Sequence, residues 1–306
     1  MMVRKFLFII FLLIIVQSMA QQQYVISQYM FNGLVVNPAY AGIHESWSFT
    51  MMTRSQWSGI PGAPTTHTFS AHGPITRNKE SSAGLIFVKD EFGAISFNNV
   101  FGVYTYRISF DRGQQHLSMG LQGGFSNFHV ELSREDLIDP DDPALNSDYN
   151  STFPNFGTGI YYSDKKFYAG LSVPFIVNNR LNQNEQDLSR QVRHYYLTGG
   201  GIFMLNHDIK YKPSFMVRYL DGAAPDIDIT NSFLLKDIIW TGITYRWSNS
   251  IDFILEIQFT DNLRFGYSYG LITSELSQVS TGSHELVINY RIKKQHPKVN
   301  HPRRFR

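Results

Sequence analysis

The chain has 306 residues, of which 27 are Lys or Arg and 25 are Asp or Glu, and it contains no cysteine. This near balance of charge gives no reason to expect nucleic-acid binding, and the absence of cysteine excludes a disulfide scaffold. Phe and Tyr number 24 and 17, a high aromatic content that suits the two aromatic girdles of an outer-membrane barrel.

Residues 1–20 have the three parts of a secretory signal peptide. Arg4 and Lys5 supply the basic region, residues 6–16 form the apolar core, and small residues precede a cleavage point after Ala20. The apolar core is shorter than the roughly 18 residues that cross a bilayer, so we expect cleavage, with a membrane anchor as the alternative. Without the two basic residues, the remaining basic and acidic residues are equal in number.

Residues 21–45 precede the first expected strand. Asn37-Pro38 favours a turn or an extended entry into that strand, and Gly42 permits a backbone conformation that other residues resist. We expect this periplasmic N-terminal segment to pack into the mouth of the barrel as a plug or brace. Contact with a partner protein is the alternative.

From residue 46 to residue 293 the chain alternates apolar and polar residues with the period of a β-strand, and helical spacing is nearly absent. The pattern predicts an all-β fold, a closed antiparallel transmembrane β-barrel of the outer-membrane type with about 14 strands. The expected strands are 46–57, 64–72, 81–89, 95–110, 115–128, 155–162, 166–175, 193–205, 208–219, 226–235, 238–247, 251–259, 263–270 and 285–292.

The connections between these strands alternate in length. Even-numbered connections are short turns, such as 111–113 and 260–262, whereas the longer ones, such as 127–154 and 176–191, are odd-numbered. Outer-membrane barrels have short periplasmic turns and longer extracellular loops, so we expect both termini in the periplasm. The apolar faces should then meet lipid and the polar faces the lumen; a soluble β protein would pack its apolar faces inward.

The polar faces predict a filled lumen without a catalytic site. Charges of both signs favour a cross-linked, largely closed interior over a selective pore. These inward charges are Lys210, Lys212, Arg218, Arg246, Arg264, Asp252, Glu256 and Glu285. Glycines on the same face leave room for something inside, namely Gly120, Gly124, Gly157, Gly159 and Gly170.

No constellation of residues predicts an enzyme, a metal centre or a cofactor site. His67 and His72 lie on opposite faces of one strand, and the other histidines give no Ser-His-Asp arrangement. Acidic residues crowd the loop 131–148, but their spacing is not that of a helix–loop–helix calcium site. Solvated surface charge is the favoured interpretation of that loop, and a weak cation or cargo contact stays open.

The chain ends in a basic tail, 294–306, which is either solvated and disordered or docks onto an acidic periplasmic partner. Its cations, with the residue before it, are Lys293, Lys294, Lys298, Arg303, Arg304 and Arg306.

Signature residues at both ends of the mature chain resemble a known family. The first set is Gln28, Tyr29, Met30, Phe31, Asn32, Asn37, Pro38, Ala39, Tyr40, Ala41 and Gly42, and the last is Gly282, Ser283, His284 and Glu285. Further matches lie between them, such as Pro213-Ser214 followed by Arg218-Tyr219. Together they resemble the PorP/SprF family of Bacteroidota, outer-membrane components of the type IX secretion and gliding-motility system.

The resemblance implies a non-enzymatic barrel in the cell outer membrane that assists export or surface attachment of cargo, such as large adhesins with a C-terminal sorting domain. It implies contacts with outer-membrane lipid, other type IX secretion components and peptidoglycan-associated periplasmic proteins. The signature residues would serve as structural or partner contacts. A FadL-like or porin-like channel for small molecules is the alternative function. Whether the chain is a core component or a cargo-dedicated paralogue stays open.

Overall fold

The computed structural model describes residues 26–131, 148–179, 192–220, 223–247 and 249–292. The predicted signal peptide, Lys293, the basic tail and most of the acidic loop lie outside these ranges. In the part of the chain described, no helix is both long and apolar enough to cross a membrane.

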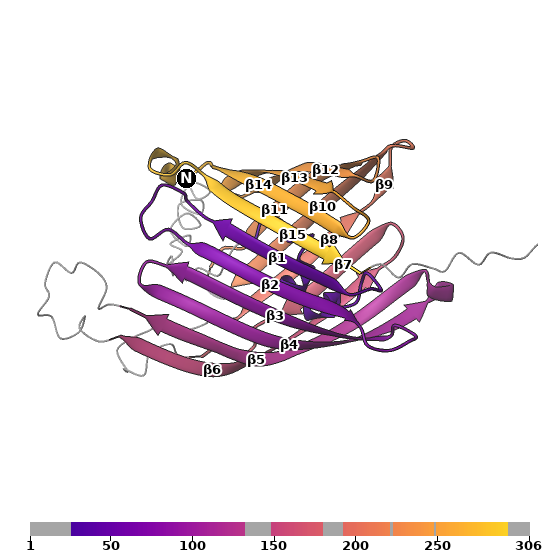
Figure 1. The fold of residues 1–306 in the computed structure, drawn as a ribbon, viewed down its shortest axis with the longest axis horizontal. Helices are drawn as coiled ribbons and strands as arrows, with labels where there is room; N and C mark the ends of the chain where they lie inside the picture. The colour runs from indigo at the N-terminus through magenta and orange to yellow at the C-terminus, as the bar shows by residue number, and fades with distance from the viewer. Residues whose placement is uncertain (1–25, 132–147, 180–191, 221–222, 248, 293–306) are drawn as a thin grey trace, which may run out of the picture.

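Strands dominate the structure and close into a barrel (Figure 1). They are β1 Ser48–Ser55, β2 Thr65–Pro74, β3 Ser81–Phe92, β4 Ile95–Phe110, β5 Gln115–Val130, β6 Tyr149–Ser163, β7 Phe167–Val173, β8 His194–Gly201, β9 Phe203–Met204, β10 Ile209–Leu220, β11 Asp226–Leu235, β12 Ile239–Arg246, β13 Ser250–Gln258, β14 Leu263–Ile272 and β15 Ser283–Arg291. Strands that neighbour each other pair antiparallel, and β1 pairs with β15 to complete the ring.

The strands β8 and β9 form one interrupted strand, because both pair with β10 in the same direction. The interruption falls opposite Pro213, which lies between the β10 partners of Gly200 and Phe203 and has no N–H for a ladder hydrogen bond. Counted this way, the structure is a closed antiparallel barrel of 14 strands, which confirms the predicted fold class.

The period-two pattern is oriented with apolar side chains outward. On β13, Leu255 is 45% exposed while its neighbour Glu256 is 2% exposed. On β14, the exposed Phe265 and Tyr267 alternate with the buried Gly266 and Ser268. A water-soluble β protein would bury the apolar side chains and expose the charged ones. The orientation is that of a barrel in lipid.

One expectation about connections needs correction. The loop predicted over 127–154 is shorter, because β5 runs to Val130 and β6 begins at Tyr149. These strand ends are held by polar pairs, such as Asn127 with Thr152, and by a small aromatic cluster that includes Phe128 and Tyr149. Because polar residues hold the pairing there, a hydropathy pattern does not reveal that the strands extend this far. Two odd-numbered connections are short as well, 93–94 and 247–249, while the longest connections are all odd-numbered.

The two ends of the barrel still differ. We call the end with connections 131–148, 174–193 and 273–282 the long-loop end. The opposite end, with turns 111–114, 164–166, 205–208, 236–238 and 259–262, is the short-turn end. The end of β15 at Arg291 lies at the short-turn end, as expected for the carboxyl side of the chain.

Candidate functional site

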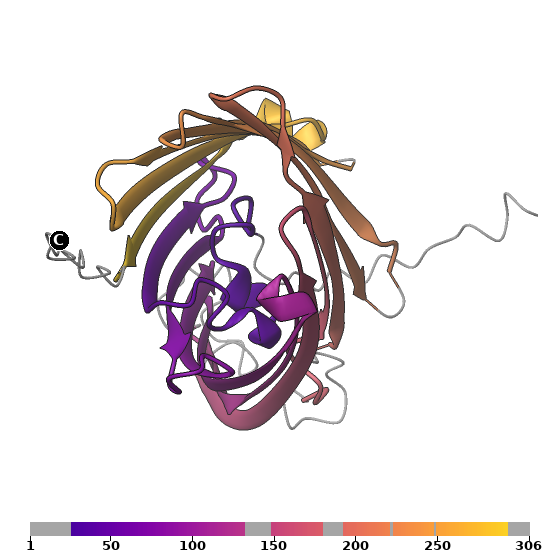
Figure 2. The same cartoon turned by 90° about the vertical axis from the view of Figure 1, so that its right-hand side faces the viewer.

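Most of residues 26–47, which we call the luminal segment, lies inside the barrel; Figure 2 shows it in indigo within the ring of strands. The segment contains the short helices α2 Gly33–Val36 and η1 Pro38–Tyr40. It begins at the long-loop end, where Ser27 contacts Glu285, and ends at the short-turn end, where the chain enters β1.

This path differs from the expected one. We predicted a plug or brace at one mouth and both termini on the same side of the barrel. The luminal segment instead adds one internal pass through the barrel, so Ser27 and the end of β15 lie at opposite ends.

The luminal segment supplies eight of the 18 buried residues in the main apolar core of the described structure. Leu34 is fully buried, and Ile26, Tyr29, Val35 and Ala39 are almost so. They belong to one cluster with lumen-facing side chains of the strands, among them Met52, Val88, Phe101, Val103, Met216 and Val287. Because open porins line their lumen with polar groups, an apolar core here indicates that the interior is built to hold this segment.

Lumen-facing glycines allow the luminal segment to approach the strands. A Cβ atom on Gly120 would lie 2.2 Å from the amide nitrogen of Ala39, and one on Gly159 would lie 2.2 Å from Oδ1 of Asn37. A Cβ on Gly170 would also meet Asn37, at 3.0 Å. These three glycines therefore leave room for an internal occupant, as predicted. The other two of the predicted set meet the strands and the connection after β7 instead: Gly124 and Gly157.

The signature residues Asn32 and Asn37 satisfy polar groups inside the lumen. The Asn37 Nδ2 donates to the Ile160 carbonyl at 3.0 Å, and its Oδ1 accepts from the Ala39 amide at 2.9 Å, which caps η1. Asn32 Nδ2 donates to Thr68 Oγ1 at 3.1 Å. Buried polar groups without partners are costly, so these contacts account for amide side chains at both positions.

Gly42 is a signature residue at which the backbone conformation requires glycine. Its φ of +74° lies in the left-handed region, and a Cβ there would meet Ser82 Oγ at 1.8 Å. Its amide donates to His72 Nδ1 at 3.0 Å. His72 thus faces the lumen, whereas His67 faces outward and contacts Thr53, so the two histidines lie on opposite faces as predicted.

At the long-loop end, the carboxylate of Glu285 holds the start of the luminal segment. Its Oε2 accepts from the Ser27 amide and its Oε1 from the Gln28 amide, both at 2.9 Å. Arg54 Nη1 lies 3.2 Å from the same carboxylate and donates to Ser27 Oγ at 2.6 Å. Ser27 Oγ in turn donates to Asp252. The first and last family signatures therefore meet at one buried carboxylate.

A second set of buried charges adjoins this contact. Arg246 Nε lies 3.0 Å from Asp228 Oδ1, and its Nη1 lies 3.5 Å from Asp252 Oδ2. Arg218 also reaches Asp228, at 3.4 Å. Unpaired buried charges cost several kcal/mol each, so the inward charges of this end stabilise the barrel only as a connected network.

The rest of the last signature lies beside this network or on the outer face. Ser283 Oγ accepts from the Trp57 amide at 3.2 Å, and Gly282 has a φ of +115°. The His284 ring packs beside Tyr267 and Tyr269 on the outward side. Among the residues that the structure describes, no group of three or more His, Cys, Asp or Glu side chains could hold a metal ion.

At the short-turn end, ion pairs are accompanied by contacts between cations and aromatic rings. Arg264 Nε pairs with Glu256 Oε1 at 2.7 Å, while the Lys212 ammonium lies 4.4 Å from the ring centroid of Trp240. The Trp240 ring meets Phe31 of the luminal segment edge to face, with centroids 5.1 Å apart. No pattern in the sequence predicted this aromatic contact.

The sequence matches the family described as "Type IX secretion system membrane protein PorP/SprF" over residues 18–290. A search of curated proteins gave no match. Among solved structures, the barrel is similar to the Ralstonia pickettii toluene transporter TbuX, with a TM-score of 0.55, 9% identity, and coverage of 85% of this chain and 93% of that chain. The CymD monoaromatic hydrocarbon channel gives a TM-score of 0.52, 10% identity, and coverage of 87% and 93%.

At such low identity these likenesses show the fold alone. The family match covers nearly all of the described barrel and includes both signatures that meet at Glu285. The chain therefore belongs to the PorP/SprF family of type IX secretion system membrane proteins, and both its fold and its family indicate the outer membrane.

Proposed function

We propose that this barrel assists the export or surface attachment of cargo proteins, such as large adhesins, by binding proteins at its two ends and without catalysis. The observation that carries the proposal is the luminal segment, which occupies the interior where a channel would conduct. Its core side chains, its glycine contacts and the Glu285 carboxylate hold it along the length of the lumen.

In this proposal the short-turn end faces the periplasm, as in other outer-membrane barrels. Peptidoglycan-associated proteins and other type IX secretion components would bind there, helped by the basic tail. Cargo would meet the long-loop end, which carries the acidic loop.

A channel for small molecules is the second candidate function. It is favoured by the fold likeness to proteins named as a toluene transporter and a monoaromatic hydrocarbon channel. For this chain, the luminal segment would have to move before any solute could pass.

Two measurements separate these functions. Purified full-length protein in a planar bilayer should show little steady conductance, and host cells lacking the protein should lose surface cargo while taking up toluene normally. Normal surface cargo in those cells, together with lost toluene uptake or a large steady conductance, would establish the channel instead. Both the export role and the channel role are non-catalytic, so we expect the purified protein to convert no substrate.

A further inference from the structure

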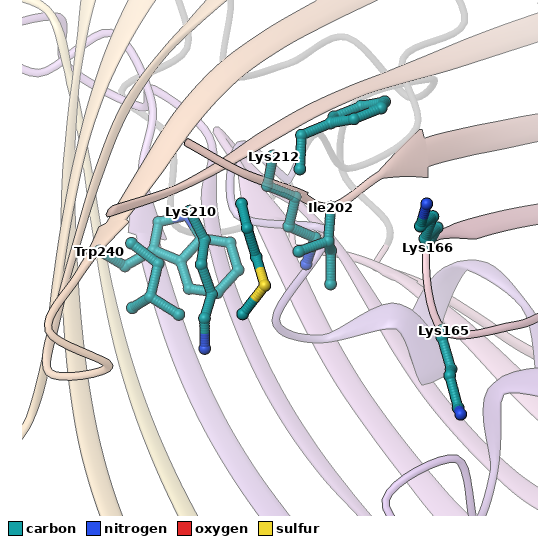
Figure 3. A pocket seen from close by; sticks show the side chains of 9 residues that line it. Lys165, Lys166, Ile202, Lys210, Lys212 and Trp240 are labelled. Carbon is teal, nitrogen blue, oxygen red and sulfur yellow. The ribbon is translucent and has the colours of Figure 1, made fainter. Parts of the chain in front are cut away.

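A cavity of about 720 Å³ lies at the short-turn end (Figure 3). Four lysines line it, Lys165 and Lys166 from the turn between β6 and β7 and Lys210 and Lys212 from β10. The apolar side chains of Trp240, Leu234 and Met204 lie among them. None of its 9 lining residues, all of them described in the structure, is acidic. We call this cavity the basic pocket.

The basic pocket belongs to the lumen side of the barrel. Lys212 alternates with the outward Phe215 and shares the face of Ser214, which is 5% exposed. Trp240 shares the face of the buried Thr244, and its ring touches Phe31 of the luminal segment. Met204, at 75% exposure, marks the opening at the rim. A ligand would therefore enter from the aqueous side of the short-turn end, because bilayer lipid meets the opposite face of these strands.

The charge of the basic pocket is only partly neutralised within the chain. Lys210 Nζ contacts Asp237 Oδ1 at 2.5 Å, on a carboxylate that is largely exposed. Lys212 lies over Trp240 and, more distantly, over Tyr168 at 5.7 Å. By contrast, Arg54 and Arg246 at the long-loop end, and Arg264 at the short-turn end, are each paired with a buried carboxylate. Among the described residues, four lysines thus face one contacting carboxylate, that of Asp237, so the basic pocket carries an excess of positive charge beside its apolar side chains.

We propose that the basic pocket binds an acidic peptide segment that carries an apolar or aromatic side chain, presented by a protein at the short-turn end. The lysines would pair with its carboxylates, and Trp240 and Leu234 would bury its apolar side chain. The volume lies within the ~300–1,000 Å³ of ordinary ligand sites, enough for a few side chains and too little for a folded domain. The inference rests on the proposed function, because it names the chemistry of one partner.

The test uses full-length protein in nanodiscs of zwitterionic lipid and a fluorescein-labelled peptide of alternating Glu and Phe. Fluorescence polarisation should show saturable binding that weakens about fivefold per lysine removed in K212Q and in K165Q/K166Q. The matched control K236Q changes a lysine in a turn at the same end that does not line the pocket, and it should keep full affinity. Because K165Q/K166Q changes only a turn, it reports on binding even where K212Q disturbs the lumen.

The proposal would be overturned by no saturable binding to the unaltered protein, by equal loss in K236Q, or by equal binding of a Glu–Ser peptide, which would indicate charge attraction alone. Decanoate at excess should leave the peptide bound; displacement would assign the pocket to a free anionic amphiphile. Because the assay contains no secretion machinery, an absence of peptide binding would count against the basic pocket and not against the export role. The export role is tested separately by the amount of cargo on the cell surface.

Discussion

Arg54 and Glu285 are paired residues on β1 and β15, the two strands whose contact closes the barrel, and their side chains form a buried ion pair with Nη1 and Oε2 3.2 Å apart. The Arg54 side chain is 3% exposed and the Glu285 side chain 0%. Since the same carboxylate accepts the amides of Ser27 and Gln28, one side chain joins the first strand, the last strand and the luminal segment.

Replacing Glu285 with Gln should destabilise this junction strongly. The amide keeps the shape of the side chain but leaves the Arg54 guanidinium without its closest buried counter-charge, a change that typically costs about 3–5 kcal/mol. We expect a lower midpoint for the heat-induced mobility shift of the barrel in gels and greater protease access to the luminal segment. Glu275→Gln, in the exposed η4 turn Glu275–Gln278 of the same end, is the matched control. An unchanged midpoint in Glu285→Gln would show that the contact contributes nothing.

Replacing Gly120 with Ala tests whether the luminal segment is tightly seated. The new Cβ would lie 2.2 Å from the Ala39 amide nitrogen, so the segment has to shift, at a typical cost of about 1–3 kcal/mol. Gly102→Ala is the control, because its Cβ would face outward, 3.9 Å from the Gly123 carbonyl oxygen. Conductance steps in a planar bilayer should become more frequent in Gly120→Ala than in Gly102→Ala. Equal traces would indicate that the segment is loosely held.

Acid should loosen the luminal segment through His44. Burial lowers the pKa of this imidazole well below its usual 6.5, and nearby Arg291 and His72 act in the same direction. Its folded pKa is thus depressed relative to the unfolded chain. The neutral ring therefore favours the folded state fully above about pH 6.5, and this stability falls as the pH drops below that value.

The measurement is the unfolding midpoint at pH 7.5 and at pH 5.5. The range stays above the region where Glu45 titrates, since a hydrogen bond from Lys79 lowers the pKa of that carboxyl from its usual 4.5. We expect His44→Gln to reduce the difference between the two pH values and His207→Gln, in a turn at the short-turn end, to leave it unchanged. A pH difference that persists in full in His44→Gln would assign the effect to another group.

Removing residues 293–306 tests the proposed contact of the basic tail with a periplasmic partner. The described barrel ends its pairing at Arg291, so the truncated chain should keep its heat-shift midpoint. Surface cargo should decrease in cells that make it. If cells with the truncated protein display as much surface cargo as wild-type cells, the proposed contact between the tail and a periplasmic partner is wrong.

Much of the fold could be predicted because lipid imposes a period-two pattern on every strand, as on β13 and β14. Glycines on the polar face, such as Gly120, also pointed to an occupant. The path of that occupant could not be predicted, because Gln28 finds its partner 257 residues away in Glu285 and hydropathy carries no information about such a pair. The ends of β5 and β6 were missed for a related reason, since polar cross-strand pairs hold them.

The position of the Arg54–Glu285 pair bears on how the barrel is made. The seam between β1 and β15 forms last in any pathway that adds hairpins in chain order, and the carboxylate beside it needs the amides of Ser27 and Gln28. A barrel that closed without the segment would deprive the Glu285 carboxylate of both amide donors and leave the apolar side chains of the lumen exposed to water. We therefore expect the strands to pair around the luminal segment, so that this segment, which precedes every strand in the chain, serves as a template for barrel assembly.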